Sequence, residues 1–411
     1  MIDRVVFVVT ELEPYTAGGA GAVVAGLADR LAAMGTEVTV VLVADVAATP
    51  TPDVGVVVAP PDPALVATEG PFLARSRAAA DAVAAICAEA APALVEFQDF
   101  DGLGFWALSH RRELGLEAVP LGVRLHGPVD LMLEAMGGGA PELEPAAAME
   151  REAFAMADLV IVPSAAMGEV AATRYDLDPN RIRVGAPPVP ELDPAERSPA
   201  PHPEFVAYGR LAEVKGSTDF LQAALDVAAA RDDVRFRFIG PDGWSVAGRR
   251  PMREWLEAQI PEPERGRITF EPEVDRQHLG RALSSAWAVV VPSRYESFCL
   301  AAHEVRRLGV PLLVRDLPAF QGLFGPETGT VVYQTEADLA AAMRRLADDP
   351  DRLSALAAAP APAVGDPLDP YRDPPPQPRH ARSQAGLATA AVTRVAEAVV
   401  IAATPAATSV S

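Results

Sequence analysis

The sequence is nearly free of lysine and cysteine. Lys215 is its one lysine, and every other basic side chain apart from histidine is arginine. A lysine kept against this background either is an ordinary surface residue or serves a purpose that needs a compact, flexible ammonium. The two cysteines, Cys87 and Cys299, lie far apart and follow no disulfide or metal-binding spacing. They exclude a disulfide scaffold and suit a reducing cytoplasm, where we expect the protein to be.

Long hydrophobic runs are absent as well. The best transmembrane candidate, residues 392–403, is short and contains Arg394 and Glu397. The sequence enters a strand pattern at once, without a secretory signal. A net charge of −21 argues against nucleic acid and, more weakly, against an anionic membrane, but it leaves room for a basic pocket. We therefore expect a protein without a nucleic-acid partner or a membrane-spanning segment, and its oligomeric state is not predicted.

Strand and helix patterns alternate along 411 residues, enough for two domains of ordinary size. In the first half a continuous apolar run is followed by a glycine-rich loop, a helix pattern and a second strand, which together indicate a βαβ unit. The strands expected here cover residues 4–10, 37–43, 93–97, 119–125 and 159–163, and the first helix covers residues 23–34. Such alternation predicts an open, doubly wound α/β domain over residues 1–190.

A proline-dense segment, residues 185–203, is typical of a linker. A second alternating pattern follows it and predicts another doubly wound domain over residues 204–365. Its expected strands are residues 205–208, 235–239, 268–270, 288–291 and 311–314, and its expected helices are residues 217–230, 249–259, 275–284 and 300–308. After a second proline-rich spacer we expect a last helix within residues 379–403.

The sequence GRLAEVKG at residues 209–216 lies between an expected strand and an expected helix. In open α/β sheets this is the edge where ligands bind, and a helix N-terminus favours anions. Arg210 offers a forked contact and Lys215 a mobile point charge. Two cations beside a helix end suit a diphosphate better than a single carboxylate.

A second chemical pattern, PSRYESFCLAAHE at residues 292–304, also follows a buried strand and opens a helix. Glu296 lies in its loop and Glu304 in its helix. Their carboxylates are suited to accepting hydrogen bonds from several hydroxyls or to acid/base chemistry. Solvent-exposed acids on a capped helix remain the alternative.

The two motifs together resemble those of the retaining GT-B glycosyltransferases, family 4 in particular. That family has Gly-Arg-Leu-x-x-x-Lys-Gly followed by Pro-Ser-x-x-Glu-x7-Glu, and the likeness runs from Val5 to about Leu346. The resemblance implies two Rossmann-like domains facing a cleft, with the last helix crossing back to the N-terminal domain. It implies a nucleotide diphosphate sugar, most commonly a UDP-sugar, as the donor, and it implies no bound metal or other cofactor.

The resemblance also implies roles for the donor-side residues. Arg210 and Lys215 would hold the diphosphate, Glu296 the transferred sugar and Glu304 the ribose. The backbone N–H groups of Phe298, Cys299 and Leu300 would help to hold sugar and phosphate. Gly240 and Val274 match weaker family segments beside the nucleotide and its base.

On the acceptor side, His126 in the sequence LHGP matches the family's sugar-contacting histidine, with an ordinary loop histidine as the alternative. Gly18 and Gly19 match its first glycine loop, although a tight strand-to-helix turn would need the same residues. Asp99 and Asp101 follow a strand of the same domain. They are candidates for acceptor contacts, and helix capping is an equally good interpretation.

Four features depart from the family pattern. Cys299 replaces a common glycine, Ala186-Pro187-Pro188-Val189 replaces the usual Asn-Gly-Val-Asp, Thr16-Ala17 replaces a lysine of some relatives, and the tail is rich in proline. The first leaves the donor sugar open. None removes a charge that the reaction needs.

We therefore expect a cytoplasmic, metal-independent, retaining hexosyltransferase-type enzyme acting on a hydroxyl acceptor such as a small natural product or glycoside. Three other functions remain. One is a nucleotide-sugar epimerase of the same fold, and another is a non-catalytic sugar-nucleotide-binding subunit. The third, a pyridoxal-phosphate enzyme, would have Lys215 as its only lysine for a Schiff base.

Overall fold

The computed structural model describes residues 1–16, 18–48, 53–192, 197–378, 390–396 and 398. Its chain divides into two compact units. Unit 1 comprises Met1–Pro188 and Gly365–Ser411, and unit 2 comprises Val189–Val364. Each unit is built on one parallel sheet, so the predicted pair of doubly wound domains is confirmed. Within the described residues, no helix is both long and apolar enough to cross a bilayer.

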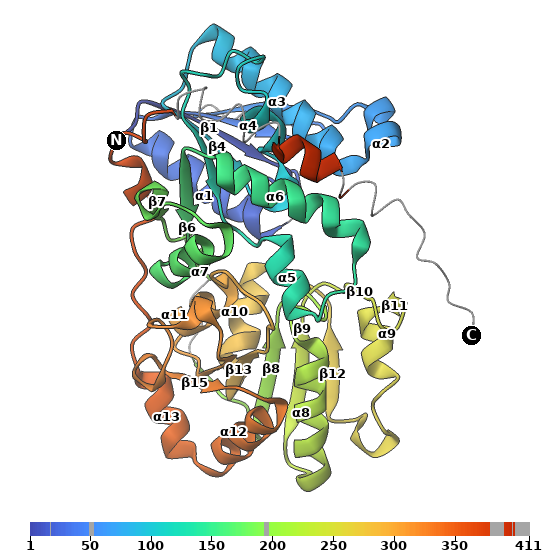
Figure 1. The fold of residues 1–411 in the computed structure, drawn as a ribbon. Helices are drawn as coiled ribbons and strands as arrows, with labels where there is room; N and C mark the ends of the chain where they lie inside the picture. The colour runs from blue at the N-terminus through green and yellow to red at the C-terminus, as the bar shows by residue number, and fades with distance from the viewer. Residues whose placement is uncertain (17, 49–52, 193–196, 379–389, 397, 399–411) are drawn as a thin grey trace, which may run out of the picture. The chain divides into compact units, whose positions relative to one another are not determined.

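Unit 1 contains a seven-stranded sheet of order β3-β2-β1-β4-β5-β6-β7 in which all pairs are parallel. The strands are β1 (Arg4–Val9), β2 (Glu37–Leu42), β3 (Val54–Val58), β4 (Leu94–Gln98), β5 (Leu121–Arg124), β6 (Leu159–Val162) and β7 (Ile182–Val184). The helices are α1 (Gly19–Ala33), α2 (Pro63–Glu69), α3 (Pro71–Glu89), α4 (Phe105–Ser109), α5 (Val129–Ala135), α6 (Glu144–Met156) and α7 (Ala165–Tyr175). Figure 1 shows this sheet with helices on both sides.

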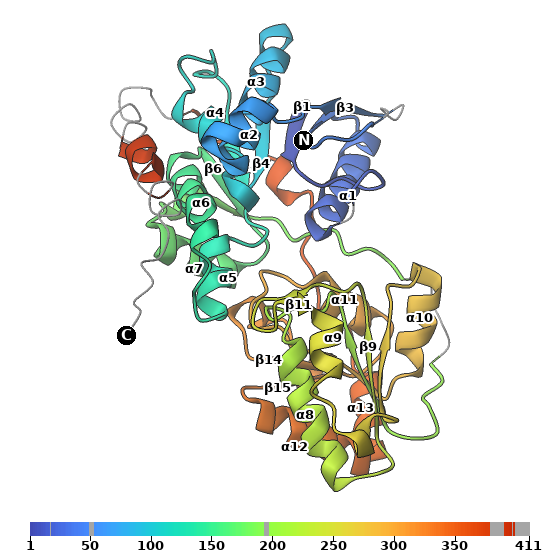
Figure 2. The same ribbon diagram turned by 90° about the vertical axis from the view of Figure 1, so that its right-hand side faces the viewer.

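Unit 2 contains a six-stranded parallel sheet of order β12-β9-β8-β13-β14-β15 and a small antiparallel pair, β10-β11. Its strands are β8 (Glu204–Tyr208), β9 (Arg235–Ile239), β10 (Trp244–Ser245), β11 (Arg250–Pro251), β12 (Ile268–Glu271), β13 (Ala288–Val291), β14 (Leu312–Arg315) and β15 (Thr330–Tyr333). Its helices are α8 (Ser217–Ala230), α9 (Met252–Glu257), α10 (Arg276–Ser285), α11 (Leu300–Arg307), α12 (Glu336–Asp348) and α13 (Pro350–Ala358). In Figure 2, α8, α9 and α12 cover one face of the sheet.

The core of unit 2 is rich in phenylalanine from β8, β9 and α8. Phe205, Phe236 and Phe238 point from the strands toward Phe220 of α8, and all four are almost fully buried. The rings of Phe220 and Phe238 meet edge to face, with centroids 4.9 Å apart. Burying these large side chains is the main force holding α8 against the sheet. The loop just before α8 is therefore anchored by its helix.

Several elements differ from the prediction. Helix α1 begins at Gly19, four residues before the expected start. A side chain at Gly21 would come within 2.9 Å of the Glu11 backbone, so close packing requires this glycine, whose low helix propensity obscures the start of the helix in the sequence. Strands β3, β7 and β15 were not predicted. Of the expected last helix, residues 390–396 and 398 are helical, and the rest lies outside the described residues.

Each sheet has a point where successive connections turn in opposite directions. In unit 2 the chain leaves β8 for β9 on one side and leaves β13 for β14 on the other, and β8 and β13 are neighbours. In unit 1, β1 and β4 hold the equivalent positions. Ligands of doubly wound sheets bind at the carboxyl ends of such strands. Both predicted motifs of unit 2 emerge there.

Candidate functional site

The first loop of the site joins β8 to α8 and spans residues 209–216. Arg210 is exposed in it, and Lys215 lies two residues before the first turn of α8. Gly216 adopts a left-handed conformation with φ of 68°. A Cβ atom there would lie 1.9 Å from the carbonyl oxygen of Pro292, so only glycine allows this loop to touch the second one.

The second loop spans residues 292–299 between β13 and α11. Cys299 ends it with φ of 69°, an uncommon conformation for a residue other than glycine. Its thiol is buried and hydrogen bonds with Glu296. Burial, together with the Glu296 charge, raises the pKa of Cys299 well above its ordinary value. The thiol is therefore protonated at neutral pH and is no nucleophile.

Lys215 and Glu296 meet between the two loops. The Lys215 ammonium donates to Glu296 Oε1 over 2.7 Å, and the hydroxyl of Ser293 donates to the same oxygen over 2.7 Å. The Lys215 side chain keeps 40% exposure, whereas that of Glu296 keeps 9%. Burial alone would lower the pKa of Lys215, but the Glu296 carboxylate holds it above its ordinary value. The site therefore presents a permanently charged ammonium that remains accessible.

Glu304 lies in α11, and its side chain is 5% exposed. The hydroxyl of Tyr208, the last residue of β8, donates to Oε2 over 3.2 Å, and Arg276 of α10 donates to Oε1 over 3.0 Å. Arg276 also donates to the carbonyl of Glu191 over 3.0 Å. Glu304 was predicted from the sequence, but Tyr208 and Arg276 were not. Nothing in the sequence marks them, because they reach Glu304 only through the pairing of distant segments.

The remaining predicted residues of unit 2 lie around these loops. Gly240 directly follows β9, and a Cβ atom there would lie 2.2 Å from the carbonyl oxygen of Gly209. Phe298 is buried in the second loop, Leu300 opens α11, and Val274 lies half-buried between β12 and α10. The structure thus brings Lys215 and Glu296 into contact, and it sets Gly240 directly against the first loop.

In unit 1, Asp99 follows β4 and is fully buried. Its Oδ2 accepts hydrogen bonds from the backbone N–H groups of His126 and Gly127, each over 3.0 Å, and Oδ1 accepts one from Phe100 over 2.8 Å. Both oxygens are occupied by the backbone. Asp99 therefore holds the His126 loop in place and caps the short helix after β4, which is the capping role that the sequence offered as an alternative to an acceptor contact.

His126 follows β5, and burial together with the nearby Arg124 charge lowers its pKa to about 3. It is therefore neutral at physiological pH. Asp101 is also buried, forms an ion pair with Arg75, and has φ of 64°. Burial raises the pKa of Asp101, although Arg75 opposes this shift.

The glycine loop of unit 1 leads from β1 into α1. Gly18 precedes the first helical residue, and a Cβ atom there would overlap the carboxylate of Glu11. A Cβ atom at Gly19 would meet nothing within 4 Å. A side chain at Gly18 would thus displace only the flexible end of Glu11, whereas one at Gly19 would enter open space. Ala17 lies outside the described residues.

In the part of the chain that the structure describes, no group of three or more histidine, cysteine, aspartate or glutamate side chains is arranged to hold an ion. The carboxylates of Glu296 and Glu304 are already bonded to cationic side chains.

Comparisons with known proteins cover both units. Residues 189–359 match the family described as Glycosyl transferases group 1, and residues 17–190 match Glycosyltransferase Family 4. Among curated relatives, D-inositol 3-phosphate glycosyltransferase of Rhodococcus jostii (strain RHA1) is 29% identical over 52% of this chain and 51% of its own. The enzyme of that name from Mycobacterium sp. (strain KMS) is 33% identical over 43% and 41%. The chain spans about half the length of the curated relatives it matches.

Solved structures agree on the fold. Sucrose-phosphate synthase from Thermosynechococcus elongatus superposes with a TM-score of 0.67 at 20% identity, covering 87% of this chain and 92% of that one. WaaG, a glycosyltransferase involved in lipopolysaccharide biosynthesis, gives 0.64 at 13% identity, covering 97% and 100%. The two family models together extend from residue 17 to residue 359. This chain therefore belongs to glycosyltransferase family 4 and has the GT-B fold.

Proposed function

We propose that the protein is a retaining glycosyltransferase that moves a hexose from a nucleotide diphosphate sugar, most simply a UDP-sugar, to an acceptor hydroxyl. One observation carries the proposal: Lys215 and Glu296 are joined over 2.7 Å where two neighbouring strands end and α8 begins. A cation and a helix N-terminus suit a diphosphate, and a carboxylate beside them suits sugar hydroxyls. Cys87 and Cys299 are unpaired thiols, which supports the cytoplasm as the proposed compartment.

The donor is proposed to lie along the two loops of unit 2. Arg210 and Lys215 bind the diphosphate, and Glu296 accepts hydrogen bonds from hydroxyls of the sugar. Glu304 binds the ribose. The N–H groups of residues 298–300, at the start of α11, bind sugar and phosphate oxygens, and Gly240 and Val274 border the nucleotide.

The chemistry follows from the charges that the reaction creates. As the anomeric bond breaks, negative charge develops on the diphosphate and positive charge on the sugar. Arg210, Lys215 and the helix end stabilise the first charge without a metal, and groups placed for this purpose commonly contribute about 100-fold each. The departing phosphate accepts the acceptor's proton on the face where the acceptor attacks, so the configuration is retained and no side chain is assigned as a base.

The acceptor is proposed to contact unit 1 through its glycine loop, Gly18 and Gly19, and through His126. A neutral imidazole is suited to donating to or accepting from a sugar hydroxyl. Asp101 keeps its proposed place near the acceptor, and Asp99 acts by holding the His126 loop. The curated relatives are named D-inositol 3-phosphate glycosyltransferase, which makes an inositol phosphate a reasonable first acceptor to test beside small glycosides.

The donor is tested by binding first. UDP, GDP, ADP and TDP are compared by thermal shift, and a panel of sugar nucleotides of the selected base is then assayed with and without acceptors. Transfer to an acceptor supports the proposal. Release of an epimerised sugar nucleotide without an acceptor would identify an epimerase, and binding without turnover would identify a non-catalytic subunit.

Two substitutions test the residue roles. Lys215→Ala should lower kcat/KM about 100-fold, as expected when a group that stabilises transition-state charge is lost. Glu304→Gln removes a hydrogen-bond acceptor for the ribose and should lower kcat/KM mainly by raising KM. Glu254→Gln alters a carboxylate of α9 that is 62% exposed and paired with Arg250, and it should leave transfer unchanged. Full activity in a folded Lys215→Ala protein would overturn the assignment.

A further inference from the structure

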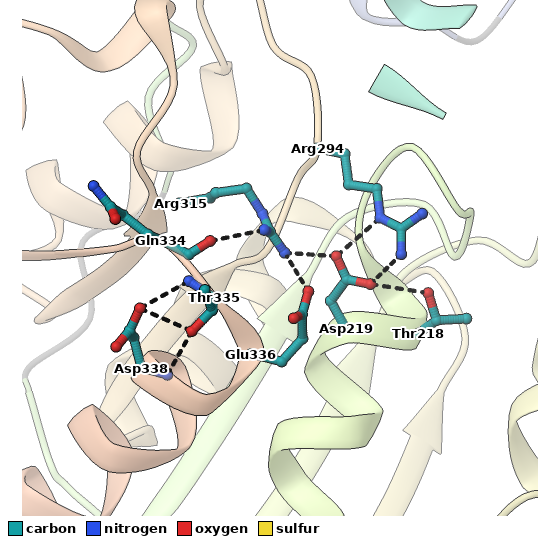
Figure 3. Close-up of polar contacts among 8 residues, drawn as sticks. All are labelled: Thr218, Asp219, Arg294, Arg315, Gln334, Thr335, Glu336 and Asp338. Carbon is teal, nitrogen blue, oxygen red and sulfur yellow. Dashed lines mark hydrogen bonds and ion pairs between the residues drawn. The ribbon is translucent and has the colours of Figure 1, made fainter. Parts of the chain in front are cut away.

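A second group of charged residues lies behind the two loops. Asp219 of α8, Arg294 of the second loop, Arg315 at the end of β14 and Glu336 of α12 form a continuous network, which we call the Asp219 network (Figure 3). None of these residues has a role in the proposed binding of the donor. Asp219 is only 4% exposed and lies at the centre.

The contacts of Asp219 satisfy both of its oxygens. Arg294 approaches it with two nitrogens, Nε to Oδ2 over 2.9 Å and Nη2 to Oδ1 over 2.5 Å. Arg315 donates to Oδ2 over 2.6 Å, and Thr218 to Oδ1 over 3.2 Å. A forked arginine–carboxylate pair fixes direction as well as distance. Asp219 therefore holds the Arg294 side chain in one orientation.

Arg294 is also held through its backbone. Its N–H donates to the carbonyl of Val214 over 2.9 Å. Val214 precedes Lys215 in the first loop, and Arg294 lies two residues before Glu296 in the second. Arg294 is thus attached to the first loop through its backbone and to α8 through its side chain, on either side of Lys215 in the sequence. The relative position of Lys215 and Glu296 follows from these two attachments.

The network continues away from the site. Arg315 donates to Glu336 over 3.0 Å and to the carbonyl of Gln334 over 3.0 Å (Figure 3). These contacts connect the end of β14 and the start of α12 to the same carboxylate. A buried carboxylate between two guanidinium groups is costly to leave half-satisfied. The network therefore resists any movement of a single loop.

We propose that the Asp219 network is a positioning device that keeps the Lys215 ammonium and the Glu296 carboxylate in the relative position that donor binding requires. Asp219 and Arg294 act through Lys215 and touch no substrate. The expected effect of the network on catalysis rests on the proposed function. Its effect on the position of Lys215 does not depend on that function.

The composition allows a direct test, because Lys215 is the one lysine of the chain. Acetylation by an N-hydroxysuccinimide ester is followed by mass spectrometry, where the Lys215 peptide is distinct from the modified N-terminus. Loss of the network in Asp219→Asn should free Lys215 from Glu296 and speed its acetylation about tenfold, the change in neutral amine that one pKa unit produces. An unchanged rate would overturn the proposal.

Asp226→Asn is the matched control. Asp226 also lies in α8 and pairs with an arginine of α12, Arg344, over 3.0 Å, but its side chain is 54% exposed and neither residue belongs to the network or to the two loops. Its variant should react at the wild-type rate. If Asp219→Asn does not fold, Arg294→Gln removes the forked contact without adding a second lysine, and it should show the same acceleration.

Kinetics separate a positioning role from a general structural one. Asp219→Asn should lower kcat/KM about 100-fold when Lys215 is present, the cost of a small misplacement of a catalytic group. In a Lys215→Ala background the same change should cost less than about threefold, because residues that act as a unit are not additive. Equal losses in both backgrounds would refute the proposal. If no transfer is found for any protein, the proposed function fails, while the acetylation rates still decide whether the network positions Lys215.

Discussion

Neighbouring residues of α11 differ in how their polar atoms are satisfied. Glu304 accepts hydrogen bonds from Tyr208 and Arg276. Neither ring nitrogen of His303 has a partner among the residues that the structure describes, and the side chain is 1% exposed. Its ring stacks on Phe298 with centroids 4.2 Å apart. His303 therefore supports the second loop as an uncharged, packed ring.

The burial of His303 predicts a loss of stability in acid. Burial, together with the Arg307 charge, lowers its pKa to about 3, far below the value near 6.5 expected in the unfolded chain. The stability that this ring contributes is thus complete above pH 6.5 and is lost as the pH falls toward 3. Between pH 6.5 and 5 the wild type should lose about 2 kcal/mol more than His303→Leu. Denaturant unfolding of both proteins at several pH values measures this, and parallel pH profiles would contradict it.

At the scale of elements, the contact between the two loops depends on a glycine. Gly216 has φ of 68° and faces the carbonyl oxygen of Pro292. Gly309 has nearly the same conformation, φ of 69°, but a Cβ atom there would meet only the Ala357 carbonyl, at an ordinary 3.6 Å. Comparing substitutions at Gly216 and Gly309 therefore separates the effect of backbone strain from the effect of a steric clash.

Gly216→Ala should therefore damage the site, whereas Gly309→Ala should not. Both substitutions place alanine in a left-handed conformation at a cost of about 1 kcal/mol. Only Gly216→Ala also forces the second loop away from the first, which should weaken binding of the selected nucleoside diphosphate about tenfold or more, as a tight overlap of 1–3 kcal/mol implies. Titration calorimetry and thermal unfolding of both variants provide the comparison. Equal affinities would show that the loops adjust independently.

Much of the element order was predictable because the central strands are continuous apolar runs. Strands β1, β8 and β13 are buried on both faces, and their apolar sequences indicate this burial. Strand β3 was missed because its burial alternates, and β7 has only three residues. Such short, half-buried segments become strands only beside an existing sheet edge.

The site was predictable to a similar degree. Lys215 and Glu296 were identified from composition and spacing, and the structure joins them. The charged pair that fixes the two loops was not identified, because Asp219 and Arg294 are 75 positions apart and look like ordinary surface charges in the sequence. Sequence patterns show which residues belong to a loop, whereas tertiary packing decides which of them are held rigid.

At the scale of the whole molecule, unit 1 is closed by a segment that returns after unit 2. Tyr371 from this segment is fully buried against the sheet of unit 1. Its hydroxyl donates to Glu96 Oε2 over 2.7 Å and accepts from Arg124 Nη2 over 2.7 Å, while Arg124 Nε donates to Glu96 Oε1 over 2.6 Å. The hydrogen bonds of Glu96 and Arg124 inside the sheet are thus completed by Tyr371, which lies almost 250 positions after Arg124 in the sequence.

Tyr371→Phe should therefore destabilise unit 1 selectively. Removing the hydroxyl leaves a buried carboxylate oxygen and a guanidinium nitrogen without their partner, which costs about 1–3 kcal/mol. Tyr333→Phe is the control in unit 2: this tyrosine is 3% exposed, and within the described residues its hydroxyl has no hydrogen-bond partner. Its loss should be neutral or slightly stabilising. Hydrogen exchange should accelerate in β4 and β5 of Tyr371→Phe and stay unchanged in Tyr333→Phe. Equal exchange in both would mean that the returning segment does not stabilise unit 1 through this hydroxyl, and that the apolar packing of the Tyr371 ring alone holds it.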